Sequence, residues 1–187
     1  MSHRFDPAKS QKLRSDERQQ ALPMTKLLPL MHIQETDLIA DIGAGNGYFT
    51  IPMAEQARHV YAVDIEDRML TELKTYAEQA RASNITLILS GLEKIALMEH
   101  QVNKIVVAFV MHEIDDFDQA FAELRRVLKP GGTIFFYEWE AVATESGPPL
   151  EIRLPSESFA RTVEEYGFTT TTHVLNDGNY MVEAVKM

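Results

Sequence analysis

The residues with the clearest chemical potential form one short segment, Asp41-Ile42-Gly43-Ala44-Gly45-Asn46-Gly47, between an apolar run and a helical pattern. Glycines at a strand-to-helix turn let a ligand approach the backbone, because no Cβ atoms stand in its way. Asp64 follows about 20 residues later, at the end of the next apolar run, where a carboxylate can accept hydrogen bonds from ribose hydroxyls. This spacing predicts a site for a ligand that contains adenosine.

The glycine segment departs from a dinucleotide-binding loop at one position. Counted from Gly43, the third glycine of the G-x-G-x-x-G pattern is replaced by Tyr48. Asp41, directly below the loop, would repel a phosphate but can bind a positively charged amino group. Both features favour an amino acid joined to adenosine. An NAD-dependent oxidoreductase is the less favoured alternative.

A second group of polar residues follows the fourth apolar run. His112 can act as a general base or bond backbone carbonyls, and Glu113 can orient His112 or bind an acceptor amine. Asp115 or Asp116 is a candidate N-cap for the next helix. These four side chains match no standard ligand spacing, so we predict no metal site.

Aromatic and basic residues follow the fifth apolar run. Alternation along a strand places Tyr137 and Trp139 on one side and Glu138 on the other. The aromatic faces of Tyr137 and Trp139 can attract a sulfonium or ammonium group, or they can pack against helices. Arg153, after Gly147-Pro148-Pro149, can hold a substrate anion or form a surface salt bridge.

The elements that must position these residues alternate along the chain. Short apolar runs rich in Val and Ile are separated by helical periodicity, which is typical of an α/β, doubly wound parallel sheet with helices on both faces. Asn176 to Asn179 reads as a hairpin turn, so the last two strands must be antiparallel. Strands are expected at 38–41, 60–64, 85–89, 105–110, 133–139, 169–174 and 180–186, and helices from the glycine loop to about 57 and at 66–81, 117–128 and 156–166.

The first 35 residues differ from the rest in charge. Residues 1–26 carry six basic and three acidic groups, a net +3, and the remainder of the chain carries −13. Good helix formers run from Ser10 to Ala21, and Pro23 opens a second short helix. We expect residues 1–35 to form a helical arm, either docked on the acidic body or closing over a site as a lid. Residues 36–187 are expected to form a single domain.

Composition narrows the function classes. The 187 residues carry a net charge of −10, which disfavours a nucleic-acid-binding surface. The absence of cysteine excludes disulfides, Cys-zinc sites and a thiol nucleophile. No run is long enough for a membrane span, and the polar start at Ser2, His3, Arg4 and Asp6 does not resemble a signal peptide. We therefore expect a cytoplasmic protein with no nucleic-acid or membrane partner.

Together these residues resemble the class I S-adenosylmethionine-dependent methyltransferases, whose first motif is an acid followed by Gly-x-Gly-x-Gly. Leu128-Lys129-Pro130-Gly131-Gly132 is similar to the fifth motif of that family, and the hairpin matches its antiparallel last strand. His112-Glu113, Trp139 and Gly147-Pro148-Pro149 resemble the small-molecule, ubiquinone-biosynthesis-like (type 11) branch. The likeness covers about residues 36–187 and implies a Rossmann-like, seven-stranded sheet.

The resemblance also implies a cofactor and roles for individual residues. S-adenosylmethionine would donate a methyl group to an oxygen, nitrogen or activated carbon atom of a small acceptor. His112 and Glu113 would be catalytic, and Tyr137, Trp139 and Arg153 would bind substrate. A non-catalytic S-adenosylmethionine-binding protein is the main alternative. The residues implied to bind the cofactor are Asp41, Gly43, Gly45 and Gly47 at its methionine end, Asp64 at the ribose, Ile65, Gly91 and Leu92 at the adenine, and Ala108 and Phe109 beside the amino group. Ile65 and Leu92 can equally belong to the hydrophobic core.

Overall fold

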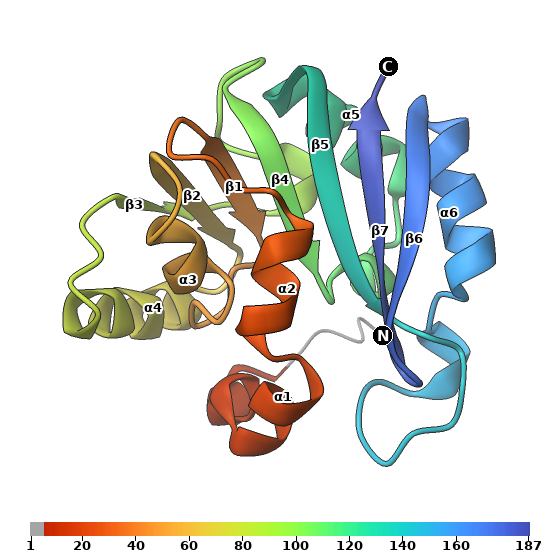
Figure 1. The fold of residues 1–187 in the computed structure, drawn as a ribbon, viewed down its shortest axis with the longest axis horizontal. Coiled ribbons are helices and arrows are strands. Elements are labelled where there is room, and N and C mark those ends of the chain that lie inside the picture. The colour runs from red at the N-terminus through yellow and green to blue at the C-terminus, as the bar shows by residue number, and fades with distance from the viewer. Residues whose placement is uncertain (1–5) are drawn as a thin grey trace.

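The computed structural model describes residues 6–187, so the predictions on Ser2, His3 and Arg4 lie outside the described residues. The chain forms a seven-stranded sheet with the strand order β3-β2-β1-β4-β5-β7-β6 (Figure 1). All neighbouring strands are parallel except β7, which is antiparallel to both β5 and β6. The predicted fold is thereby confirmed. The strands are β1 (Leu38–Ile42), β2 (His59–Asp64), β3 (Ile85–Leu89), β4 (Val102–Ala108), β5 (Leu128–Trp139), β6 (Phe168–Asn176) and β7 (Asn179–Lys186).

Helices cover both faces of this sheet. On one face, Leu27 of α2, Met31 just after α2 and Met53 of α3 pack with Val106 and Tyr137 of the central strands. On the other face, α5 and α6 pack against the opposite side of β4 and β5. The helices are α1 (Asp16–Ala21), α2 (Met24–Leu30), α3 (Thr50–Ala54), α4 (Asp67–Gln79), α5 (Phe117–Val127) and α6 (Ser156–Glu165), with 3-10 turns η1 (Pro7–Arg14), η2 (Leu92–Lys94), η3 (Met111–Glu113) and η4 (Leu150–Ile152).

The strand order fixes where a ligand can bind. Strand β1 lies between β2 and β4, so the chain leaves the sheet in opposite directions after β1 and after β4. In open α/β sheets, the crevice at such a switch point lies beyond the carboxyl ends of the strands. The glycine loop follows β1, and His112 follows β4. Both predicted groups of chemical residues therefore lie at the same edge of the sheet.

Several element boundaries differ from the sequence predictions. The helix after the glycine loop is only five residues long, Thr50–Ala54, because Asn46 to Phe49 form turns before it begins. Strand β5 begins at Leu128 because Leu128 pairs with Val102 ahead of the Pro-Gly-Gly segment. Ser156 is the first residue of α6, and Pro155 occupies the cap without a side-chain hydrogen bond.

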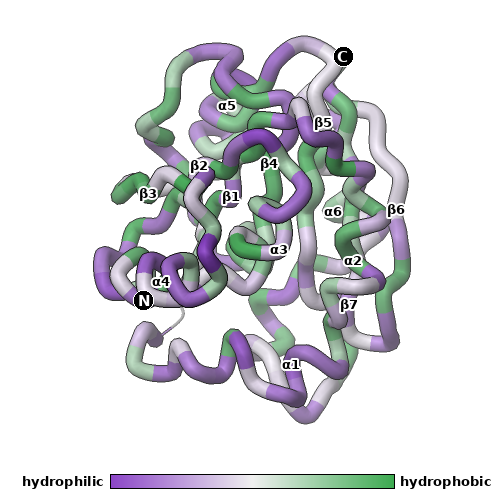
Figure 2. The backbone as a smooth tube through the Cα atoms, turned by 60° about the vertical axis from the view of Figure 1, so that its left-hand side comes forward, coloured by the Kyte–Doolittle hydropathy of each residue, from purple (hydrophilic) through white to green (hydrophobic). Residues whose placement is uncertain are grey.

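The N-terminal segment divides at Ser15. The predicted helix over 10–21 is instead a 3-10 turn followed by α1, and the Ser15 hydroxyl accepts a hydrogen bond from the Arg18 amide. Helix α1 buries none of its residues and is mostly hydrophilic (Figure 2), whereas α2 buries Leu27 in the core. In Figure 1, α1 lies at the end of the sheet toward which β4 and β5 run. None of the helices in residues 6–187 is long and apolar enough to cross a bilayer.

Candidate functional site

The glycine loop has a backbone that only glycine adopts without strain. Gly43, Gly45 and Gly47 have φ angles of +71°, +53° and +88°, in the left-handed region. The loop is also tightly enclosed. A Cβ atom at Gly47 would lie 2.9 Å from the side chain of Leu73 in α4, and one at Gly45 would lie 3.1 Å from Leu13 of the N-terminal segment. Substitution is therefore opposed by both conformation and packing.

Asp41 is a fully buried acid at the carboxyl end of β1. Its Oδ2 accepts a hydrogen bond of 2.5 Å from the hydroxyl of Thr50, the first residue of α3. Burial raises the pKa of Asp41 to about 7, although the Thr50 hydrogen bond opposes the shift and nearby Asp64 adds to it. A buried carboxyl with a raised pKa is stabilised by a neighbouring cation. The loop is therefore suited to the α-ammonium group of an amino acid.

Asp64 ends β2 and connects the glycine loop to the start of α4. Its Oδ2 accepts from the Gly45 amide at 2.8 Å, and its Oδ1 accepts from the Glu66 amide at 2.9 Å. Burial raises its pKa, and these backbone hydrogen bonds oppose the shift. A backbone hydrogen bond from Ile65 also opposes the shift, and the carboxylate, with about four acceptor sites, can still accept from a ligand hydroxyl. Asp64 therefore lies directly beside the loop, as the spacing predicted.

The residues predicted to surround an adenine take different positions. The Ile65 residue is 48% exposed. It lies beside Gly91, because a Cβ atom added to Gly91 would lie 3.7 Å from the Cδ1 atom of Ile65. Leu92 is buried in the core that lies under α5 and α6. Ser90 donates its amide to the Asp64 carbonyl at 3.0 Å, so the carboxyl ends of β2 and β3 are held together. Ile65 and Gly91 can therefore border a ligand, whereas Leu92 contributes to the core.

Ala108 and Phe109 lie where β4 ends. Phe109 has a φ of +61°, which is uncommon for a bulky side chain and is often found at binding sites. Its amide donates to the Tyr137 carbonyl at 2.8 Å, and its ring lies 5.6 Å from the ring of Trp139. The ends of β4 and β5 are thereby joined beside the glycine loop.

His112 forms a buried pair with Glu138, the penultimate residue of β5. The His112 Nδ1 atom lies 2.9 Å and 3.1 Å from the two Glu138 carboxylate oxygens, and the His112 amide donates to Oε1 at 3.2 Å. The Glu138 side chain is fully buried, and that of His112 is 5% exposed. Burial alone lowers the pKa of His112, but the hydrogen bond and charge of Glu138, with the charge of Glu113, outweigh it and raise the pKa.

Glu113 lies next to His112 and contributes to its electrostatic environment. Asp116 serves as the N-cap of α5, because its Oδ1 accepts from the Gln119 amide at 2.9 Å. Within residues 6–187, no group of three His, Asp or Glu side chains is placed to hold a metal ion. The geometry thus associates His112 with a carboxylate on the neighbouring strand.

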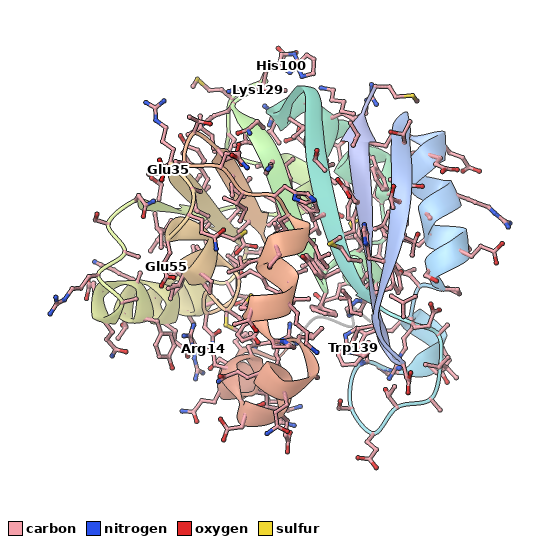
Figure 3. The ribbon with its side chains drawn as sticks, in the orientation of Figure 1. Arg14, Glu35, Glu55, His100, Lys129 and Trp139 are labelled. Carbon is pink, nitrogen blue, oxygen red and sulfur yellow. The ribbon has the colours of Figure 1, made fainter. Side chains whose placement is uncertain are left out.

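The three residues predicted to bind substrate have distinct surroundings. Tyr137 is fully buried, and its ring lies 4.8 Å from that of Phe49 in the core. Trp139 lies between Phe109 and Arg153, whose guanidinium carbon is 5.3 Å from the Trp139 ring. Figure 3 shows Trp139 at the same end of the molecule as Arg14, opposite His100 and Lys129. Trp139 is therefore the aromatic residue that can face an acceptor.

Arg153 organises the loop that precedes it. Its guanidinium donates to the carbonyls of Pro148, Val142 and Ser146 at 2.9, 2.7 and 3.1 Å. The Arg153 side chain is buried and binds carbonyls within the loop. It therefore does not form the surface salt bridge that was considered from the sequence. A contact with a substrate anion stays a prediction, and it would have to compete with these carbonyls.

Two residues of the site were missed by the sequence reasoning. Glu138 was placed on a strand side but given no role, although a charged residue within the apolar run 134–139 was a usable signal. Arg18 lies 4.6 Å from the Phe109 ring and 5.5 Å from the Tyr48 ring, measured from its guanidinium carbon. Its position follows from tertiary packing of the N-terminal segment, which no local pattern indicated.

Comparisons with known proteins agree with this geometry. A family model described as a methyltransferase domain matches residues 40–136, more than half of the chain. The ubiquinone/menaquinone biosynthesis C-methyltransferase UbiE of Acidiphilium cryptum is 32% identical over 114 residues, 60% of this chain and 46% of that protein. The demethylmenaquinone methyltransferase of Listeria welshimeri is 26% identical over 110 residues, 57% of this chain and 47% of that protein. The chain thus spans just under half the length of these relatives.

A solved structure extends the likeness to the whole fold. The S-adenosylmethionine-dependent methyltransferase of Aquifex aeolicus superposes with a TM-score of 0.91 over 98% of this chain and 100% of that chain, at 24% identity. The family and fold imply S-adenosylmethionine as the cofactor, and the buried acid below the glycine loop fits its ammonium group. The chain belongs to the methyltransferase domain family, in the class I, S-adenosylmethionine-dependent group.

Proposed function

We propose that the chain transfers a methyl group from S-adenosylmethionine to an oxygen, nitrogen or activated carbon atom of a small molecule. The buried His112–Glu138 pair carries this proposal, because it supplies a base at the carboxyl edge of the sheet. Family membership argues against the NAD-dependent alternative. A protein that only bound the cofactor would have no need of a buried base beside the site.

The residues proposed to hold the cofactor surround the glycine loop. Asp41 would bind the ammonium group, Gly43, Gly45 and Gly47 would leave room for the methionine portion, and Asp64 would accept from the ribose. Ile65 and Gly91 would border the adenine, and the backbone at Ala108 and Phe109 would lie beside the amino group. When bound, the cofactor would supply a methyl group attached to a positively charged sulfonium. Transfer of that methyl group leaves the rest of the cofactor as a neutral thioether.

The chain's own contribution is positioning and proton removal. Holding an acceptor in line can supply on the order of 7 to 11 kcal/mol of the barrier. Because Nδ1 of His112 faces Glu138, its Nε2 is the nitrogen available to accept a proton from the acceptor O–H, N–H or C–H group. Glu138 stabilises the imidazolium that forms and holds the ring in one tautomer. The aromatic face of Trp139 would border the acceptor.

The names of two relatives support the carbon acceptor. One is a C-methyltransferase of ubiquinone and menaquinone biosynthesis, and the other acts on demethylmenaquinone by its name. A hydroxylated aromatic ring becomes nucleophilic at carbon when its hydroxyl loses a proton. The His112–Glu138 pair is suited to removing that proton.

The test is methyl transfer to a panel of hydroquinones, phenols and aromatic amines, with S-adenosylhomocysteine measured as the product. We expect His112→Gln to lower turnover by about 100- to 10,000-fold without weakening S-adenosylhomocysteine binding. The matched control is His100→Gln, because His100 lies at the opposite end of the molecule (Figure 3). Cofactor binding with no turnover on any acceptor would instead favour the non-catalytic binding protein.

A further inference from the structure

The N-terminal segment lies across the glycine loop and is bound to it at both ends. The Asn46 side chain donates to the Ser10 carbonyl at 2.8 Å, and the Tyr48 hydroxyl donates to the Leu22 carbonyl at 2.7 Å. Between these contacts, Leu13 packs over Gly45. These contacts involve only residues 6–22 of the helical arm expected at 1–35, and from here on we call residues 6–22 the arm. Its central part is held directly above the loop proposed to bind the cofactor.

Arg18 of the arm extends toward the end of β4. Its guanidinium carbon lies 4.6 Å from the ring of Phe109, which follows β4, and 5.5 Å from the ring of Tyr48, which ends the glycine loop. Arg14, at the end of η1, lies instead over Tyr76 of α4 at 4.5 Å. Arg18 is therefore the arginine of the arm that lies between the two segments framing the proposed site.

Among residues 6–187, no carboxylate forms an ion pair with Arg18, although the whole chain carries 28 acidic groups. Its Nε is buried and has no hydrogen-bond partner in the described part of the chain. Burial lowers the pKa of Arg18 to about 10, and the charge of Tyr48 opposes the shift.

A buried Nε–H group without an acceptor is costly, and the surrounding rings offset only part of that cost. Aromatic faces attract the cation, but they give Nε no acceptor. A carboxylate would satisfy both needs, because the planar guanidinium donates two parallel hydrogen bonds to it. The surroundings of Arg18 are thus suited to binding a carboxylate.

We propose that Arg18 is the carboxylate-binding residue of this site, brought to it by the arm. The carboxylate comes either from the methionine end of the cofactor or from an anionic acceptor. This inference rests on the proposed function. It assigns to the arm a direct contact with ligand, so the arm acts as a lid that completes the site.

The first experiment uses calorimetric titration with two ligands that differ by one carboxylate. S-adenosylhomocysteine has the carboxylate and the ammonium group, and its decarboxylated analogue keeps only the ammonium group. If the cofactor is the source, Arg18→Met weakens S-adenosylhomocysteine binding by about 10- to 100-fold and changes binding of the analogue by less than about threefold. Arg18→Lys keeps the charge without the planar fork and should give an intermediate loss.

The second experiment tests the acceptor as the source. Protein saturated with S-adenosylhomocysteine is titrated with 4-hydroxybenzoate and with phenol, which again differ by one carboxylate. If the acceptor supplies the anion, wild type prefers 4-hydroxybenzoate and Arg18→Met loses that preference while its S-adenosylhomocysteine affinity is unchanged. Thermal unfolding of the variant confirms that it is folded.

The control is Lys12→Met, which removes the same charge from an exposed position of the same arm. It should leave every affinity within about twofold, because an exposed charge is screened. The proposal is overturned if Arg18→Met lowers the affinity for the ligand with a carboxylate and for its partner without one by the same factor. It is also overturned if the substitution changes the carboxylate preference in neither the adenosine pair nor the phenol pair. Failure of wild type to bind either adenosine ligand would instead overturn the proposed function, and the Arg18 assignment with it.

Discussion

Asp41 should make the protein less stable as the pH rises, and Asp41→Asn should remove that dependence. The pKa of the fully buried carboxyl is about 7 in the folded state against 3.8 ordinarily. Between these values the folded state holds a proton that the unfolded state has lost, so the free energy of unfolding falls with increasing pH. A difference of about 3 pKa units corresponds to about 4 kcal/mol, lost between about pH 4 and pH 8.

The assay is urea unfolding of wild type and Asp41→Asn from pH 4 to pH 8.5. We expect the variant to be more stable than wild type at pH 8, by up to about 4 kcal/mol, and the difference to shrink toward pH 4. The asparagine carbonyl can still accept from Thr50, so the hydrogen bond at α3 is kept. A variant that is destabilised equally at every pH would refute the reasoning.

Asp37 provides a control of opposite sign. Burial raises its pKa, but hydrogen bonds from Gln34, Lys104 and Asn103 and the charge of Lys104 outweigh burial and lower it. A lowered pKa contributes stability that is present above the ordinary value of 3.8 and lost as the pH falls through the folded value. Asp37→Asn should therefore lose stability at pH 7, where Asp41→Asn gains it.

The same buried acid links binding to pH. A ligand ammonium beside Asp41 favours the ionised carboxylate, so binding at pH 6 should release close to one proton. Titration in buffers of different ionisation enthalpy measures that release. Asp41→Asn should abolish this proton release and lower the affinity for S-adenosylhomocysteine, while the free energy of unfolding increases. Proton release that persists in the variant would assign it to another group.

Four further substitutions test other parts of the protein. Gly47→Ala should lower the free energy of unfolding, measured in urea, by about 1 to 3 kcal/mol, because the new Cβ atom would combine a positive φ with a contact of 2.9 Å to the side chain of Leu73. Gly131→Ala also has a positive φ but its Cβ atom would enter open space, so the loss should be about 1 kcal/mol. Glu138→Gln should lower turnover by up to about 100-fold and shift the acidic limb of the pH profile to lower pH, since it removes the charge that raises the pKa of His112. Arg153→Met should lower the free energy of unfolding in urea by about 3 kcal/mol, because three loop carbonyls lose a charged hydrogen-bond donor.

The sequence was sufficient for the sheet because its signals are local. The apolar runs at the centre of the sheet and the Asn176 to Asn179 turn each specify their own element. The glycine loop and Asp64 were likewise readable, since their roles depend on short spacing and on the ends of strands.

The sequence was insufficient where function depends on long-range packing. Glu138 and His112 are 26 residues apart, and only the pairing of β4 with β5 brings them together. Arg18 reaches Phe109 across the whole glycine loop, from a segment with no apolar periodicity. Arg153 was predicted from its charge alone, whereas its geometry is set by carbonyls of a loop whose shape no pattern specifies.

The most direct test of the central claim is calorimetric titration of the wild-type chain with S-adenosylhomocysteine, and in parallel with NADH. The buried acid, the three left-handed glycines and Asp64 predict one molecule of S-adenosylhomocysteine per chain and no measurable binding of NADH. Binding of NADH, or binding of S-adenosylhomocysteine that is indifferent to Asp41→Asn, would contradict the assignment of this loop to the methyl donor.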